Sequence, residues 1–299
     1  MALHVAKAIA AQTGRKEVLI GAADHGSILN EANGSGLTVK RIPLDRRGAP
    51  APDQLQAMIG ERTALVSVVG VNNENGAIAE LASLSTICNK SGVLFHTDLS
   101  QAPLAMDVNL LDLDISFATI SAHKLYGPKG VGAFLMGPGT SEFVKPIIVG
   151  AGQQGGRRGG TMPTELIAGF GEACRLIAKD QHGERERVAS ITNHFIRMLE
   201  EKQIASLVGD RENRHPGNAL MRFRGQNAID LLARLQPYIA ASTQSACSSG
   251  AIGPSHVLSA MGMDQDTASE CIRFSFGRFS DDRQVDQAIT LICDALTSF

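Results

Sequence analysis

Two side chains of opposite charge follow successive strand-like runs of the sequence. Asp98 ends the apolar run VLFHTD, and Lys124 lies 26 residues later, just after the run ISFATIS. A helix or loop followed by one strand fits that spacing, so both residues are expected at the same carboxyl edge of a sheet. Because open α/β sheets bind ligands at that edge, the pair indicates a ligand site.

Pyridoxal phosphate is a cofactor that would use such a pair. It forms a Schiff base with a lysine, and a carboxylate beside the pyridine nitrogen keeps the ring an electron sink. On the spacing alone, the favoured alternative is a surface lysine and a residue that merely ends a strand. Further residues of the sequence are needed to distinguish a cofactor site from this alternative.

The elements that must position this pair alternate along the first half of the chain. Helix-period stretches such as ELASLSTICNKSG separate several of the strand-like runs. The runs occupy 18–22, 38–44, 63–70, 93–98, 115–121 and 132–137. This alternation predicts βαβ units in an α/β fold, with a mostly parallel sheet that is buried on both faces.

The Gly-rich stretch GAGQQGGRRGGT divides the chain after this alternating half. Helical segments follow it, and then a shorter region in which the strands NALMRFRG and CIRFSF alternate with helices. We therefore predict a large domain over 1–163, connecting helices over 164–202 and a smaller α+β domain over 203–299.

The composition excludes several classes of protein. The 299 residues, 43% of them hydrophobic, are enough for two domains with cores. The near balance of 28 basic and 30 acidic residues, with no Lys/Arg run, argues against nucleic-acid binding. The apolar runs are too short for a membrane span, and the start lacks signal-peptide features. Five scattered cysteines without a CxxC motif argue against disulfides or a metal site and favour a reducing, cytoplasmic location.

Six segments together resemble the cysteine desulfurases of iron–sulfur cluster assembly. They occur in the family's order, at fitting spacings, and cover essentially the whole chain. The segments are VNNENG from 71, FHTDLSQ from 95, SAHKLYGPKG from 121, GGRRGGT from 155, QSACSSG from 244 and CIRFSFGRF from 271. These enzymes belong to the class V aminotransferase group of fold type I pyridoxal-phosphate enzymes, so the resemblance implies that fold and that cofactor.

The resemblance implies a role for each matching residue around the cofactor. Lys124 matches the Schiff-base lysine, and Asp98 matches the partner of the pyridinium nitrogen. Gln101 matches the side chain that binds the ring hydroxyl. His25 matches the histidine that stacks on the ring, although by itself it reads as an ordinary loop histidine. Asn73 matches an asparagine beside the cofactor and the substrate.

Four further matches concern the phosphate, the substrate and a second subunit. Ser121 and His123 match phosphate contacts. Thr161 matches a threonine that reaches the phosphate across a dimer interface, which implies a homodimer. Arg273 matches the arginine that grips the substrate carboxylate, a role that suits the forked donors of guanidinium. By itself Arg273 would read as a surface salt-bridge residue of little consequence.

Cys247 carries the reaction-specific prediction. It lies in a stretch of small, polar and Gly residues ahead of a helix expected to start near Pro254 or Ser255. An exposed thiol there can ionise and attack. The resemblance implies that Cys247 takes sulfur from L-cysteine as a persulfide, releases L-alanine, and passes sulfur to a cluster scaffold or other acceptor. The remaining cysteines have apolar contexts and are predicted to be buried: Cys88, Cys174, Cys271 and Cys293.

Two departures from the family pattern affect these expectations. Gln244 stands where the family usually has a glycine. Family members also carry, ahead of the point that matches Met1, several tens of residues with a Gly/Thr-rich phosphate-binding turn. We therefore expect an N-terminally truncated chain with weakened cofactor binding. The alternatives are another class V enzyme, such as a selenocysteine lyase or an aminotransferase, or a non-catalytic relic that acts as a binding protein.

Overall fold

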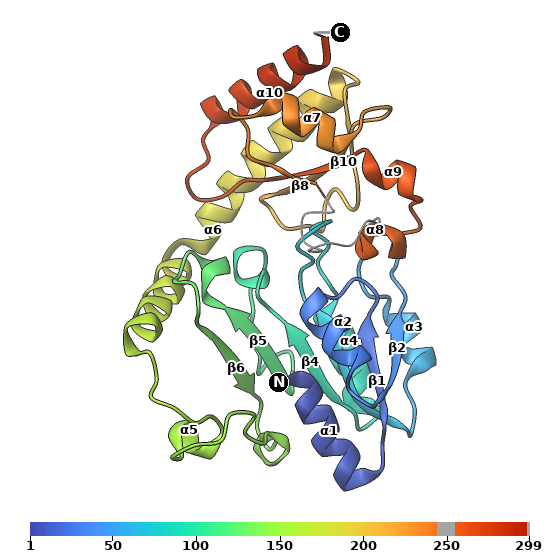
Figure 1. The fold of residues 1–299 in the computed structure, drawn as a ribbon, viewed down its shortest axis with the longest axis vertical. Helices are drawn as coiled ribbons and strands as arrows, with labels where there is room; N and C mark the ends of the chain where they lie inside the picture. The colour runs from blue at the N-terminus through green and yellow to red at the C-terminus, as the bar shows by residue number, and fades with distance from the viewer. Residues whose placement is uncertain (244–254, 298–299) are drawn as a thin grey trace. The chain divides into compact units, whose positions relative to one another are not determined.

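The computed structural model describes residues 1–243 and 255–297, which divide into two compact units (Figure 1). The first unit comprises Met1–Asp45, Ala49–Val71 and Ala79–Lys179. The second unit comprises Arg46–Gly48, Asn72–Ile78 and Asp180–Phe299. Two short segments of the first half of the chain thus belong with the C-terminal residues.

A six-stranded sheet in the order β2-β1-β3-β4-β5-β6 forms the centre of the first unit. Every neighbouring pair is parallel except β5 and β6, which are antiparallel. The strands are β1 (Glu17–Gly21), β2 (Thr38–Ile42), β3 (Thr63–Val69), β4 (Leu94–Asp98), β5 (Phe117–Ser121) and β6 (Gly132–Met136). The predicted α/β fold with a mostly parallel sheet is confirmed.

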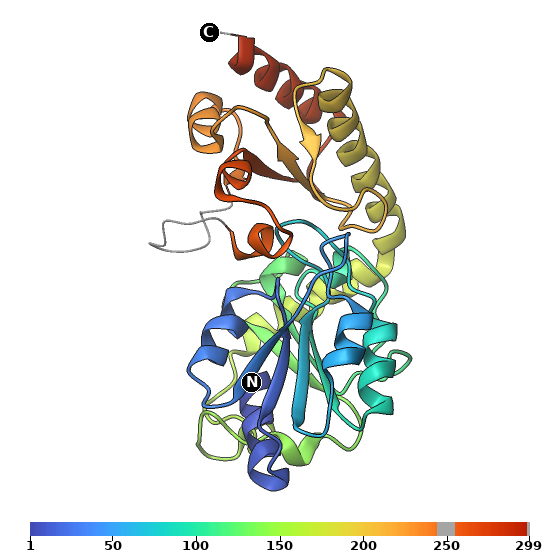
Figure 2. The same cartoon turned by 90° about the vertical axis from the view of Figure 1, so that its right-hand side faces the viewer.

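Helices cover both faces of this sheet because its central strands are apolar on both sides. Each residue of β1 and β3 is buried. The helices α1 (Ala2–Thr13) and α2 (Gly26–Asn33) contact each other on one face. On the other face α3 (Pro52–Met58) contacts α4 (Leu81–Lys90) (Figure 2). The short helices α2 and α3 were not among the predicted elements.

Short elements complete the first unit after β4, β5 and β6. They are η1 (Ala102–Leu104), η2 (Ala122–Leu125), η3 (Ser141–Phe143) and α5 (Gln153–Gly156). The long helix α6 (Thr164–Glu201) then leads into the second unit and is interrupted by the non-helical Asp180. The two units divide at that interruption.

The second unit contains a four-stranded antiparallel sheet in the order β7-β8-β10-β9. The strands are β7 (Ser206–Leu207), β8 (Asn218–Arg222), β9 (Ser242–Thr243) and β10 (Cys271–Ser275). The helices are α7 (Ala228–Leu235), α8 (His256–Ala260), α9 (Gln265–Ser269) and α10 (Asp282–Thr297), besides the end of α6. Buried aromatic rings form its core, with the Phe195 and Phe274 centroids 4.9 Å apart.

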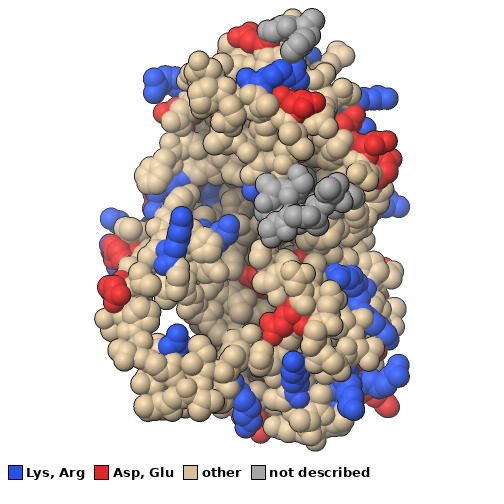
Figure 3. All heavy atoms as spheres, in the orientation of Figure 1, with Lys and Arg blue, Asp and Glu red and all other residues tan. Residues whose placement is uncertain are grey.

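The surface carries interspersed charges of both signs on the face that Figure 3 shows. Within the described part of the chain, no helix is both long and apolar enough to cross a membrane.

Candidate active site

The carboxyl ends of β4 and β5 bring Asp98 and the SAHK segment to one edge of the sheet. Asp98 is the last residue of β4, and the parallel neighbour β5 pairs with it through Thr119. Lys124 lies in η2, directly after β5. The turn beyond β4 is joined to the end of β5, because Ser100 Oγ lies 3.3 Å from Ser121 Oγ. The backbone N–H of Ser100 donates to Asp98 Oδ1 at 2.9 Å, which fixes the carboxylate.

The loop that carries Lys124 has a tightly determined backbone. Gly127 N–H donates to Ala122 O at 3.0 Å, and Tyr126 adopts a left-handed conformation with φ of 60°. A Cβ atom at Gly127 would lie only 2.9 Å from Ala122 O, so the turn requires glycine. His123 and Lys124 are exposed on this turn. The Lys124 amine forms no hydrogen bond or ion pair with the described residues and is available to a ligand.

His25 lines the same pocket as Asp98. This cavity of about 160 Å³ is also lined by Asp24, Ser67 and His96. His25 caps the N-terminus of α2, where its Nδ1 accepts from the backbone N–H of Ser27 at 3.2 Å. Because Nδ1 accepts, a neutral His25 carries its proton on Nε2. An imidazole and a carboxylate therefore share one cavity at the sheet edge.

His96 also belongs to this pocket, and it is not among the predicted site residues. Its Nδ1 lies 2.7 Å from Ser67 Oγ, and its Nε2 has no partner among the described residues. Burial lowers the pKa of His96 to about 3, so the ring is neutral at physiological pH. The sequence does contain one indication of this role. His96 lies two residues before Asp98 in the same strand, and alternate residues of a strand share a face.

Asp24 is a buried carboxyl group that connects the His25 turn to the strand beside Asp98. It is 2% exposed, and its Oδ1 accepts from the backbone N–H of Val69 at 2.8 Å. Val69 is the register partner of Asp98. Burial, opposed by the Val69 hydrogen bond and reinforced by the charge of Asp98, raises the pKa of Asp24 well above its ordinary value. The two carboxyl groups therefore lie close enough for the charge of Asp98 to disfavour ionisation of Asp24.

Arg273 is a half-buried arginine of the second unit. It lies on β10, where its Nη1 donates to Asn73 O at 2.9 Å and its Nη2 donates to Ser242 Oγ at 3.2 Å. Its Nε is buried and has no partner among the described residues. Buried donors are normally satisfied, so this guanidinium group has capacity for a carboxylate.

The NNEN sequence from 72 to 75 supplies the loop that holds Arg273. Asn72 Oδ1 accepts from the backbone N–H groups of Glu74 and Asn75, at 2.8 and 3.1 Å. Asn75 uses its side chain to bind Gly48 O and Ala77 N. The side chain of Asn73 forms no hydrogen bond with the described residues, although its carbonyl group binds Arg273. The side chains of Asn72 and Asn75 thus stabilise the shape of the loop, while the Asn73 amide stays available to a ligand.

A sequence profile of the aminotransferase class-V family matches residues 2–288. The chain belongs to this family. It is 35% identical over 263 residues to the cysteine desulfurase IscS of Rickettsia bellii (strain OSU 85-389), a match that covers 87% of this chain and 64% of the relative. The chain therefore spans less than two thirds of that relative.

Two further relatives lead to the same family. The cysteine desulfurase IscS of Pseudomonas putida (strain W619) is 33% identical over 288 residues, which is 95% of this chain and 71% of that enzyme. A solved NifS-like protein superposes with a TM-score of 0.90 at 26% identity, covering 100% of this chain and 80% of the other. The class-V fold extends through both units.

The class-V enzymes depend on pyridoxal phosphate, and the first unit of this chain contains a donor set that fits it. Asp98 is a carboxylate suited to a ring nitrogen, and the imidazole of His25 lines the same pocket. The Lys124 amine is unpaired among the described residues, on the adjacent strand end. Hydroxyl groups of Ser100 and Ser121 add polar contacts at that edge.

Three further predicted site residues are not among the groups described above. Gln101 is half-buried at the start of η1, and its side chain makes no capping hydrogen bond. Thr161 is exposed in the loop before α6. Cys247 lies outside the described residues.

The other four cysteines are free thiols, and one of them corrects the sequence analysis. Burial raises the pKa of Cys88 to about 12 and that of Cys271 to about 11, so neither is a ready nucleophile. Cys293 is half-buried. Cys174 was predicted to be buried but is exposed, because its neighbours Ala173 and Ile177 define the inward face of α6. Partial burial raises its pKa as well.

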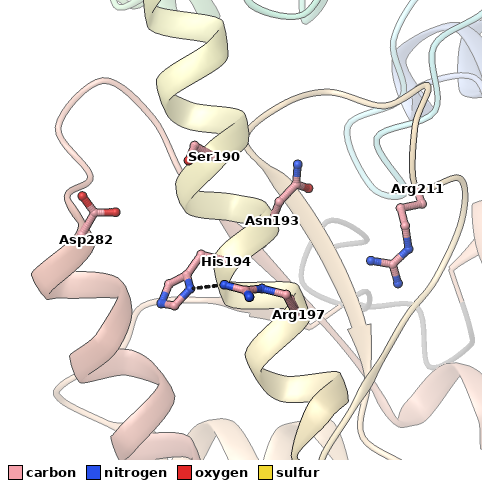
Figure 4. A pocket seen from close by; sticks show the side chains of 6 residues that line it. All are labelled: Ser190, Asn193, His194, Arg197, Arg211 and Asp282. Carbon is pink, nitrogen blue, oxygen red and sulfur yellow. Dashed lines mark hydrogen bonds between the residues drawn. The ribbon is translucent and has the colours of Figure 1, made fainter.

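A separate, open pocket of the second unit contains none of the predicted site residues (Figure 4). Its lining is polar and charged: Ser190, Asn193, His194, Arg197, Arg211 and Asp282. Arg197 Nη2 lies 3.3 Å from His194 Nδ1, and His194 Nε2 lies 2.8 Å from Asp286 Oδ1. These side chains bind one another on the helix surface, which is typical of a solvated face. Within the described residues, no three His, Cys, Asp or Glu side chains are grouped to hold a metal ion.

Proposed function

We propose that this class-V protein is a pyridoxal-phosphate-dependent cysteine desulfurase. It would convert L-cysteine to L-alanine and leave the sulfur as a persulfide on Cys247. The observation that carries the proposal is the arrangement of Asp98 and Lys124 on neighbouring parallel strand ends, with His25 in the Asp98 pocket. The names of the relatives favour desulfuration over another reaction of the family.

The first unit would hold the cofactor. Lys124 would bind it covalently, and Asp98 would pair with its ring nitrogen. His25 would stack on the ring, and Gln101 would bind the ring hydroxyl group. When bound, pyridoxal phosphate supplies an electron sink that stabilises negative charge on the substrate carbon.

Three hydrogen-bonding groups would complete the phosphate site. Ser121 lies at the end of β5, and His123 is exposed on the following turn. Thr161 is exposed and so is available to a second copy of the chain, in the homodimer that we propose.

The second unit would hold the substrate and the nucleophile. Arg273 would bind the carboxylate of L-cysteine through its remaining donors, beside the free amide of Asn73. Lys124 would move the protons on the substrate carbons. The Cys247 thiolate would attack the substrate sulfur, forming an S–S bond while the C–S bond breaks. The carbon keeps that electron pair and takes a proton, so alanine and the persulfide account for all atoms and electrons.

The proposal includes a place of action and a partner. A reducing compartment keeps thiols free, so the thiol nucleophile favours the cytoplasm as the place of action. The persulfide would pass its sulfur to an acceptor protein, such as a scaffold for iron–sulfur clusters.

The direct test is turnover of L-cysteine by the protein reconstituted with pyridoxal phosphate. We expect alanine in the solution and an added sulfur atom on the protein, measured together by amino-acid analysis and mass spectrometry. Transfer of the amino group to a 2-oxo acid without loss of sulfur would instead identify an aminotransferase. Turnover restricted to selenocysteine would identify a lyase, and failure to take up the cofactor would indicate a binding protein.

Asp98→Asn is expected to preserve the fold and to impair turnover. The amide oxygen can still accept from Ser100 N–H, but it no longer pairs as an anion with the ring nitrogen. Breaking such a pair costs about 3–5 kcal/mol, or roughly two to four orders of magnitude in rate. Alanine release at saturating cofactor measures the loss. The exposed Asp112→Asn serves as the control, and equal rates for both variants would remove Asp98 from its role.

Arg273→Lys is expected to raise the KM for L-cysteine by about 10- to 100-fold. Lysine keeps the charge but cannot offer two parallel donors, and a hydrogen bond to a charged group is worth about 1.5–3 kcal/mol. Steady-state kinetics measure the change. Arg224 is exposed in the same unit, so Arg224→Lys should leave the KM unchanged. An unchanged KM in Arg273→Lys would assign the carboxylate to another residue.

A further inference from the structure

Glu74 is a buried acidic residue without a role in the proposed reaction so far. It is 5% exposed in the loop between β3 and α4, and this part of the loop belongs to the second unit. Its Oε2 accepts a hydrogen bond from the hydroxyl group of Ser255, which is 8% exposed. A buried carboxylate is costly unless it is well paired, so the partners of Glu74 indicate what it does.

Ser255 is the residue at which helix α8 begins. Its Oγ accepts from the backbone N–H groups of Val257 and Leu258, at 3.1 and 3.4 Å. The single hydroxyl proton is therefore free to be donated to Glu74. The Ser255 hydroxyl group thus accepts hydrogen bonds from the first turn of the helix and donates its proton to the Glu74 carboxylate.

The next residue of the loop binds the other end of the same helix. Asn75 Nδ2 lies 3.3 Å from Sδ of Met261, the residue at which α8 ends. The loop also holds Arg273, since the carbonyl oxygen of Asn73 accepts from the guanidinium group at 2.9 Å. Three consecutive residues thus connect both ends of α8 to the arginine on β10.

We propose that Glu74 is a positioning residue for the thiol step, because it fixes Ser255 relative to Arg273. In the sequence Ser255 follows Cys247 by eight residues. The inference rests on the proposed desulfurase function. Glu74 touches neither substrate nor cofactor in this role. It fixes the residue that follows the Cys247 segment in the chain, and it does so from the same loop that holds Arg273.

The test compares Glu74→Ala with Glu212→Ala, an exposed glutamate of the same unit. We expect Glu74→Ala to slow persulfide formation on Cys247 about 10- to 100-fold in a single turnover. The KM for L-cysteine and the absorbance of bound pyridoxal phosphate should stay within about twofold of the wild type. Glu212→Ala should match the wild type in all three measurements.

Two further variants separate positioning from a general loss of stability. Glu74→Gln keeps an acceptor for Ser255 and should slow the thiol step less than Glu74→Ala; it also serves if the alanine variant fails to fold. Because Glu74 and Ser255 act as a pair, the double variant with Ser255→Ala should be no slower than the slower single variant. An unchanged persulfide rate in folded Glu74→Ala, or a parallel rise in KM, would overturn the proposal.

A measurement without substrate distinguishes this proposal from the proposed function. The rate at which iodoacetamide alkylates Cys247, followed by mass spectrometry, should differ from the wild-type rate in Glu74→Ala and not in Glu212→Ala. If the wild type forms no persulfide, the proposed desulfurase function is wrong. The alkylation rates still test whether Glu74 acts on the Cys247 segment through Ser255. Equal alkylation rates in all variants would refute the proposal that Glu74 acts on the Cys247 segment.

Discussion

We expect Lys124→Ala to abolish covalent retention of pyridoxal phosphate and all turnover of L-cysteine. The substitution removes the amine that would bind the cofactor and move protons on the substrate. The loop should keep its shape, because its turn is made by Ala122, Tyr126 and Gly127 through backbone atoms. The measurement is borohydride reduction of the loaded protein, followed by peptide mass spectrometry.

Lys129→Ala is the matched control for this experiment. Lys129 is an exposed lysine of the same segment, five residues further along the chain. It should retain the cofactor and full activity. If Lys124→Ala protein still carries reduced cofactor on another lysine, the assignment of the anchor is wrong. Comparison of melting temperatures excludes unfolding as the cause of the loss.

Cys247→Ser is expected to stop sulfur transfer while leaving cofactor chemistry intact. Serine keeps the size of the side chain, but its hydroxyl group is hardly ionised at neutral pH and is a far weaker nucleophile. The variant should bind pyridoxal phosphate and respond to L-cysteine with a change in visible absorbance. It should form no persulfide and, beyond a trace, no alanine.

Cys174→Ser provides the control, since Cys174 is the exposed cysteine among the described residues. It should support the wild-type rate, and peptide mapping of the wild type should find the added sulfur on Cys247. Sulfur found on Cys88, Cys174, Cys271 or Cys293 would overturn the mechanism. The raised pKa values of Cys88 and Cys271 argue against both as acceptors.

The sheet of the first unit and the edge that carries its polar residues could be predicted from the amino-acid sequence. Apolar runs of strand length, alternating with helical periods, require parallel strands buried on both faces. Once β4 and β5 are parallel neighbours, their spacing in the chain places Asp98 and Lys124 at the same edge. The helices α2 and α3 escaped prediction because they have only 8 and 7 residues, too few to establish a clear period.

The partners of the buried polar groups could not be predicted in this way, because they depend on how the elements pack. Arg273 binds a carbonyl group 200 residues away, and Glu74 binds a hydroxyl group 181 residues away. Periodicity reports which face of an element is buried, but it carries no information about which distant side chain lies opposite. The lowered pKa of His96 and the raised pKa of Asp24 have the same origin, since both depend on burial by the completed fold. The sequence therefore specified the elements and their edges, while the hydrogen bonds that position Arg273, Asp24 and Glu74 exist only once those elements are packed.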